Sequence, residues 1–159
     1  MKRAFRIGFS FGLPSGIVTT LGLMVGLNSS TQSQFIVIGG ILTIAIADSL
    51  SDAMGMHFSQ ESENHLSHEE IWKSTIFTLL AKFIFSIIFI IPVLFLPLNL
   101  AILVSVLMGA YLIFAISLIL AREQNEDPIK VIGSHLLITF SVILIAHFVG
   151  IFVSQVFGY

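Results

Sequence analysis

The chain has 159 residues, of which 56% are hydrophobic and only 10% are charged, and its mean hydropathy is +1.02. Soluble domains usually carry about 25% charged residues. This composition therefore excludes an ordinary soluble domain and indicates an integral membrane protein. The chain has no cysteine, which excludes disulfides and thiolate metal sites. The net charge of −2 says little by itself. We expect the lipid bilayer, and no nucleic acid, as a partner.

Five apolar runs are long enough to cross a bilayer as helices, which takes roughly 20 residues. In chain order they cover residues 7–27, 35–58, 74–96, 98–121 and 131–153. The first run is too long for the core of a signal peptide, so we predict that it is retained. The sequence thus predicts an all-α membrane protein with a single five-helix transmembrane domain over residues 1–159. A short loop at 59–73, with acidic residues and histidines, would join the second and third helices.

The basic residues all fall on one side of this predicted arrangement. They are Lys2, Arg3, Arg6, Lys73, Lys82, Arg122 and Lys130. Because basic residues favour the cytoplasmic side of a membrane, we predict a cytoplasmic N-terminus and a C-terminus on the opposite side. The expected location is an integral, multi-pass position in the plasma membrane of a prokaryote, or otherwise in an organelle membrane.

Two carboxylates, Asp48 and Asp52, lie inside the second apolar run. A charge at mid-membrane costs about 2.5 kcal/mol or more, so such residues usually face a cavity or a partner. A spacing of four places both acids on one helix face. Met56 continues this face and Ser51 borders it. Carboxylate, hydroxyl and thioether groups together form a candidate site for a divalent cation.

A structural ion pair is the alternative interpretation of Asp52. Lys82 lies in the third run at a similar depth. The two side chains could form a buried pair, or Lys82 could extend to the membrane surface. A pair of this kind leaves Asp48 unexplained, which favours a cavity.

The first run contains regularly spaced glycines and one proline. Glycines recur every four residues from Gly8 to Gly16, a spacing that lets helices pack backbone to backbone. Pro14 removes a backbone hydrogen bond and leaves the carbonyl of Ser10 short of a partner. Such a carbonyl, together with Ser15, could line a polar path. The alternative is a kinked and tightly packed helix with no ion role.

The connection between the second and third runs is rich in acids and histidines. Its candidate metal ligands are Glu61, His65, His68 and Glu69. The spacing of three between the histidines, with a glutamate directly after them, would let a helical loop present a metal site. A solvated acidic loop is the alternative. The sequence contains no nucleophile–base pair, phosphate loop or nucleotide motif, so we expect that the protein is not an enzyme.

Four stretches of the sequence resemble the vacuolar iron transporter family, as a divergent member with a short loop. FGLPSGIVTTLGLMVGL is similar to the glycine-rich opening of that family, and LSDAMGMHFSQESE is similar to the end of its second span. IIPVLFLPL is similar to the proline-marked end of its third span. LAREQNEDPIKVIGSHLLITFSVILIAHFVGIFV is similar to its polar turn and glycine-punctuated fifth span.

This resemblance implies a homodimer of five-helix protomers that exports Fe²⁺ or Mn²⁺ from the cytosol in exchange for protons. The metal ion would be the transported substrate, with no permanently bound cofactor. The ion path would run near the two-fold axis, where the glycine-rich first span would pack against its copy. The alternatives are a passive cation channel on the same frame, and a non-transporting scaffold subunit with a structural Asp52–Lys82 pair.

The sequence departs from the family's motif at the positions expected to bind metal. The family's first-span aspartate falls at Ser15, its second-span methionine at Asp52, and its glutamate after the glycine at Met56. The carboxylate and the thioether are thus redistributed, and Asp48 adds an acid one turn deeper. We predict that Asp48 and Asp52 alternately bind metal and protons, with Met56 as a soft ligand and Ser15 facing them.

Overall fold

A computed structural model describes residues 2–63 and 66–157 of the protein. These residues form six helices and no strand. The helices are α1 (Lys2–Thr31), α2 (Gln34–Glu63), α3 (His68–Ile87), α4 (Ile90–Phe95), α5 (Leu98–Gln124) and α6 (Pro128–Phe157). Helices α3 and α4 make up one apolar stretch, so five stretches are long and apolar enough to cross a membrane. The predicted all-helical architecture with five candidate spans is confirmed.

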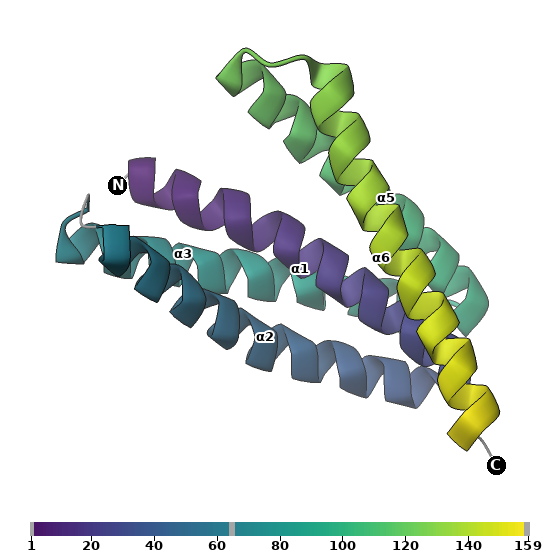
Figure 1. Cartoon of the computed structure of the whole chain (residues 1–159). Helices are drawn as coiled ribbons and strands as arrows, with labels where there is room; N and C mark the ends of the chain where they lie inside the picture. The colour runs from purple at the N-terminus through teal and green to yellow at the C-terminus, as the bar shows by residue number, and fades with distance from the viewer. Residues whose placement is uncertain (1, 64–65, 158–159) are drawn as a thin grey trace.

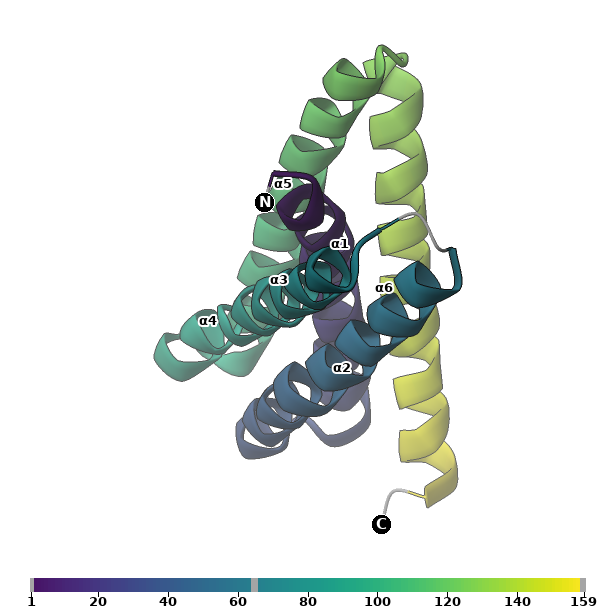
Figure 2. The same ribbon diagram turned by 90° about the vertical axis from the view of Figure 1, so that its left-hand side faces the viewer.

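Helix α1 lies at the centre of the molecule and contacts α2, α3, α5 and α6. Figure 1 shows α1, α2 and α3 running alongside one another, with the α5–α6 hairpin crossing them steeply. The hairpin meets α1 near the end of that helix and diverges from it toward the N-terminus. Figure 2, viewed from the side of the N-terminus, shows the α5–α6 connection standing apart from the first turns of α1.

The predicted loop at 59–73 is largely helical. Helix α2 continues through Glu63 and α3 begins at His68, so residues 66–67 are its only described non-helical part. Ser67 caps α3 because its hydroxyl accepts a hydrogen bond from the Glu70 N–H, while the Glu70 carboxylate accepts one from the Ser67 N–H at 3.2 Å. The sequence prediction missed these helix ends because they are polar and extend beyond the apolar runs.

Prolines explain how the third span ends. Pro92 cannot donate a hydrogen bond to the carbonyl of Ile88, and the helix breaks there into α3 and α4. Pro97 likewise leaves the carbonyl of Val93 without its helical donor. The side-chain amide of Gln34, from the start of α2, donates to this carbonyl instead. This hydrogen bond therefore joins the end of the third span to the start of α2.

The glycine face of α1 packs against α3 of the same chain. A Cβ atom added at these glycines would meet carbonyl oxygens of α3: Ser74 at 2.5 Å from Gly8, Thr78 at 2.6 Å from Gly12, and Lys82 at 2.8 Å from Gly16. This face was predicted to pack against a partner subunit, but α3 of the same chain occupies it at Gly8, Gly12 and Gly16.

Replacing Gly12 by alanine is expected to destabilise the protein. The added methyl group would meet the backbone of α3 and force α1 and α3 apart, and overpacking of this kind costs about 1–3 kcal/mol. The measurement is the melting temperature of the detergent-purified protein. Gly39→Ala is the matched control, because nothing lies within 4 Å of that added methyl. A Gly12→Ala variant that melts with the wild type would contradict the close α1–α3 contact.

Candidate functional site

A buried lysine lies between the two aspartates of α2. The side chain of Lys82 is 1% exposed, and its Nζ lies 2.6 Å from Asp48 Oδ2. The same Nζ donates a hydrogen bond to Asp52 Oδ2. The Asp48 contact has the distance of an ion pair but lacks hydrogen-bond geometry, and Asp48 Oδ2 has no hydrogen-bond partner among the described residues. Because charge attraction depends on distance far more than on angle, both acids are paired with Lys82.

Helix α1 contributes a hydroxyl to the same group. Ser15 Oγ donates a hydrogen bond of 2.7 Å to Asp52 Oδ2. Asp52 thus accepts hydrogen bonds from two helices, while Asp48 has only the ion contact with Lys82. These four residues (Ser15, Asp48, Asp52 and Lys82) are called the acid–lysine cluster below.

Two local features of the sequence build this cluster. The spacing of four along α2 places the two carboxylates on successive turns of one face, so a single ammonium between them reaches both. The small surface of α1 at Gly16 lets the backbone of Lys82 come close. Lys82 then lies beside the turn of α1 that carries Ser15. The structure places Ser15 against Asp52 but not against Asp48. It also contains the Asp52–Lys82 pair that was the alternative interpretation, and Asp48 joins that pair.

The charges of the acid–lysine cluster do not cancel. Two ionised carboxylates and one ammonium give a formal charge of −1, and a buried net charge is costly unless it is compensated. The side chains of Asp48 and Asp52 are 29% and 23% exposed, whereas Lys82 is enclosed. One further positive charge, from a proton or a cation, would neutralise the cluster and can approach it from the side of the acids.

Asp48 opens onto a groove between α1 and α2. The groove has a volume of about 490 Å³. Its remaining walls are Leu23, Leu27, Ile36, Gly40, Thr43, Ile44 and Ala47. These walls are almost entirely apolar, so Asp48 is the one charged group that the groove reaches among the described residues. The groove provides an opening to the cluster on the outer surface of the helices.

The other predicted ligands on α2 lie outside the cluster. Ser51 is exposed and Met56 is partly buried one turn beyond Asp52. The hydrogen bonds and ion pairs of the cluster include neither residue. Glu61 is exposed near the end of α2. The face predicted from spacing exists, but only its two aspartates are joined by Lys82.

The predicted ligands of the α2–α3 connection have partners of their own. His68 accepts a hydrogen bond of 3.1 Å from the indole N–H of Trp72, and Glu69 pairs with Lys73. His65 lies outside the described residues. Within the described ranges 2–63 and 66–157, no three His, Asp or Glu side chains come close enough together to hold a metal ion. Metal capture by this segment remains a prediction.

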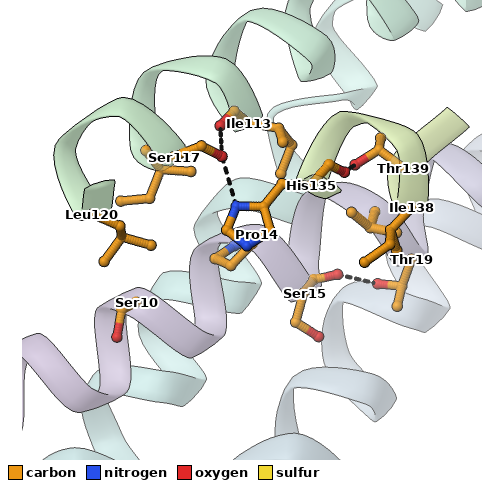
Figure 3. A pocket seen from close by; sticks show the side chains of 12 residues that line it. Ser10, Pro14, Ser15, Thr19, Ile113, Ser117, Leu120, His135, Ile138 and Thr139 are labelled. Carbon is orange, nitrogen blue, oxygen red and sulfur yellow. Dashed lines mark hydrogen bonds between the residues drawn. The ribbon is translucent and has the colours of Figure 1, made fainter. Parts of the chain in front are cut away.

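The structure also brings together a second group of polar residues, which was not predicted from the sequence. A cavity of about 360 Å³ lies between α1, α5 and α6 (Figure 3). Its polar lining residues are Ser10, Ser15, Thr19, Ser117, His135 and Thr139. Ser15 belongs both to this cavity and to the acid–lysine cluster. No short spacing in the sequence indicates this region, because its residues come from three separate helices.

The geometry defines an all-helical protein with five helices suited to a membrane and a buried acid–lysine cluster among three of them. Comparison of the chain with protein-family models and with curated proteins gives no match.

Proposed function

We propose that the protein is a multi-pass membrane transporter that exchanges divalent transition-metal ions for protons at the acid–lysine cluster. The observation that carries this proposal is the enclosed ammonium of Lys82 between two partly exposed carboxylates. Ionisable groups at this depth of an apolar helix are costly and are mostly found on ion or proton pathways. In this proposal, the two carboxylates bind a positive charge, which Lys82 supplies while no ion is bound.

Charge balance gives the exchange a stoichiometry. A divalent ion bound by both carboxylates would bring the formal charge of the cluster from −1 to +1 if Lys82 kept its proton. Repulsion between the metal and the ammonium favours loss of that proton to water. The remaining two carboxylates, metal ion and neutral amine have a formal charge of zero. We therefore expect one proton to leave for each divalent ion that binds.

The class of ion follows from the ligands and from the sequence motifs. Carboxylate oxygens suit Mn²⁺ and the harder divalent ions, and a thioether favours softer ones. Met56 lies one turn beyond Asp52 on the same helix and could add such a ligand. The resemblance to the vacuolar iron transporter family favours Fe²⁺ or Mn²⁺ and export from the cytosol. The one-sided basic residues favour a cytoplasmic N-terminus.

A structural role for the cluster is the competing proposal. Lys82 pairs with both acids, as expected of a non-transporting scaffold subunit that uses the cluster to hold α2 against α3. In that case a metal ion would neither displace the ammonium nor release a proton. The two proposals therefore differ in an observable quantity.

Metal uptake by liposomes that contain the purified protein tests the proposed function. We expect saturable uptake of Fe²⁺ or Mn²⁺, accompanied by a change of internal pH opposite in direction to the metal movement. Zn²⁺, Co²⁺ and K⁺ are compared in the same assay, and protein-free liposomes provide the baseline. Uptake without any pH change would indicate a passive channel. No uptake of any of these ions would favour the scaffold.

A further inference from the structure

Two adjoining cavities form one cleft between α1 and the α5–α6 hairpin. The outer cavity, of about 360 Å³, lies between α1 and α5 and has Arg6 and Glu123 in its wall. Arg6 Nε lies 3.9 Å from Glu123 Oε2. The inner cavity is the one shown in Figure 3, and it shares Ser10, Ile116 and Leu120 with the outer one. The cleft therefore leads from charged residues near the N-terminus into the middle of the helices.

The inner cavity has a mostly apolar surface, into which α1, α5 and α6 each bring hydroxyl groups. Its hydroxyl groups donate their hydrogens to backbone carbonyls: Ser10 to Arg6 at 2.6 Å, Thr19 to Ser15 at 2.8 Å, and Thr139 to His135 at 2.8 Å. Each of these hydroxyl oxygens keeps lone pairs. Pro14 adds the carbonyl of Ser10, which has lost its helical donor. Such a lining suits molecules that donate hydrogen bonds, and water is the simplest of them.

The hydrogen bonds of Ser117 fix the tautomer of His135. Ser117 Oγ lies 2.6 Å from the carbonyl oxygen of Ile113 and 2.8 Å from His135 Nδ1, as the dashed lines in Figure 3 show. A hydroxyl has one hydrogen and a carbonyl can only accept, so Ser117 donates to Ile113 and Nδ1–H donates to Ser117. In the neutral ring, Nε2 then carries the lone pair. It has no hydrogen-bond partner among the described residues.

Ser15 connects the inner cavity to the acid–lysine cluster. It lines the cavity, and its hydroxyl, which points away from His135 in Figure 3, donates to Asp52 Oδ2 at 2.7 Å. His135 is the only titratable side chain in the described lining of the inner cavity. The charged groups along the cleft are Arg6 of α1 and Glu123 of α5 in the outer cavity and, behind Ser15, Asp52 of α2 with its partner Lys82 of α3.

We propose that this cleft is a hydrated proton path from the N-terminal end of the molecule to Asp52, with His135 as its proton-accepting residue. His135 Nε2 takes a proton from a hydronium ion that enters past Arg6 and Glu123 and leaves a water molecule behind. The imidazolium then gives this proton to a water molecule in the inner cavity, which becomes hydronium. Ser15 takes a proton from this hydronium and gives up its own hydroxyl proton along its hydrogen bond with Asp52, so one proton is delivered to the acid–lysine cluster. The role of the path in metal exchange rests on the proposed function, whereas its hydration does not.

Single cysteines test the hydration of the cleft, because the chain has none of its own. Ile138 lines the inner cavity, and its neighbour Leu137 is also exposed but does not line it. With the protein in liposomes, Ile138→Cys should react with a membrane-impermeant thiol reagent about tenfold faster than Leu137→Cys, because the reactive thiolate forms in water and not in lipid. The reaction should occur only from the side of the N-terminus. Equal rates would overturn the hydrated path.

The role of His135 is tested by His135→Gln in the liposome assay. Glutamine keeps polar atoms but cannot carry the proton, so proton-coupled uptake should slow about tenfold and lose part of its pH dependence. His147→Gln is the matched control, because His147 pairs with Ser29 at the other end of α6, at 2.7 Å. A wild-type rate and pH profile in His135→Gln would overturn its role. If the wild type moves no metal at all, the proposed function fails, and the cysteine comparison still decides whether the cleft is hydrated.

Discussion

Replacing Lys82 by methionine is expected to lower the free energy of unfolding by about 3–5 kcal/mol, the usual cost of removing one partner from a buried ion pair. Methionine keeps much of the length of the side chain but leaves Asp48 and Asp52 as two neighbouring acids with no cation between them. Both carboxylates are only partly buried, which places the expected loss toward the lower end of that range. Thermal unfolding of the purified protein at pH 7 measures the effect.

The triple variant Lys82→Met, Asp48→Asn, Asp52→Asn is the control for this substitution. It removes all three charges together, and the loss of a complete ion cluster is often nearly neutral for stability. We therefore expect the triple variant to recover most of the lost stability. Acid should also partly rescue the single variant, since protonated carboxylates no longer repel one another. If Lys82→Met unfolds at the wild-type temperature, the ion pairs contribute little to holding α2 and α3 together.

The two aspartates are expected to be essential for metal binding but less so for folding. Asp48→Asn leaves Lys82 paired with Asp52, and Asp52→Asn leaves it paired with Asp48, so neither variant isolates the ammonium. Mutation of a residue that only orients a metal ligand typically costs about 10–100-fold in metal affinity. Loss of both carboxylate ligands themselves should therefore cost at least about 100-fold. The double variant should neither bind nor transport metal.

Glu126→Gln is the matched control for the aspartate variants, because Glu126 is an exposed acid between α5 and α6. It should bind and transport metal as the wild type does. Circular dichroism and melting temperature establish that each aspartate variant is folded before metal binding is compared. Metal transport that survives the double substitution would show that the ion binds elsewhere.

The candidate spans were predictable because apolar runs of this length have few alternative explanations. Their exact ends were not, since α2 and α3 extend through polar residues to Glu63 and from His68. The capping hydrogen bonds of Ser67 and Glu70 determine where α3 starts. In the sequence, such a cap is a much weaker signal than a long apolar run. The segment 59–73 was therefore predicted to be a loop, although most of its residues are helical.

The acid–lysine cluster was predictable only in part. Helical periodicity identifies the face that carries Asp48 and Asp52, and a similar depth suggests Lys82 as a partner for one of them. The position of the ammonium between both acids depends on how closely α3 approaches α1 and α2. That approach is set by the contact of Gly16 with the backbone of Lys82. Glycine spacing indicates a close contact but does not say which helix makes it.

The cleft between α1 and the α5–α6 hairpin could not be predicted from spacing. His135 and Ser117 lie on different helices, and only their contact fixes which ring nitrogen carries the hydrogen. The sequence signals that do exist are Pro14 and the neighbouring hydroxyl residues, which indicate a polar stretch of α1. They do not indicate that α5 and α6 supply the opposite walls.

Proton release on metal binding tests the exchange site most directly. Fe²⁺ or Mn²⁺ is added to the detergent-purified protein in a weakly buffered solution, and the released protons are counted against the metal bound. We predict about one proton for each ion in the wild type, because the cluster then reaches a formal charge of zero, and none in the Asp48→Asn, Asp52→Asn double variant. Metal binding without proton release in the wild type, or undiminished release in the double variant, would contradict the proposal that the acid–lysine cluster exchanges metal for protons.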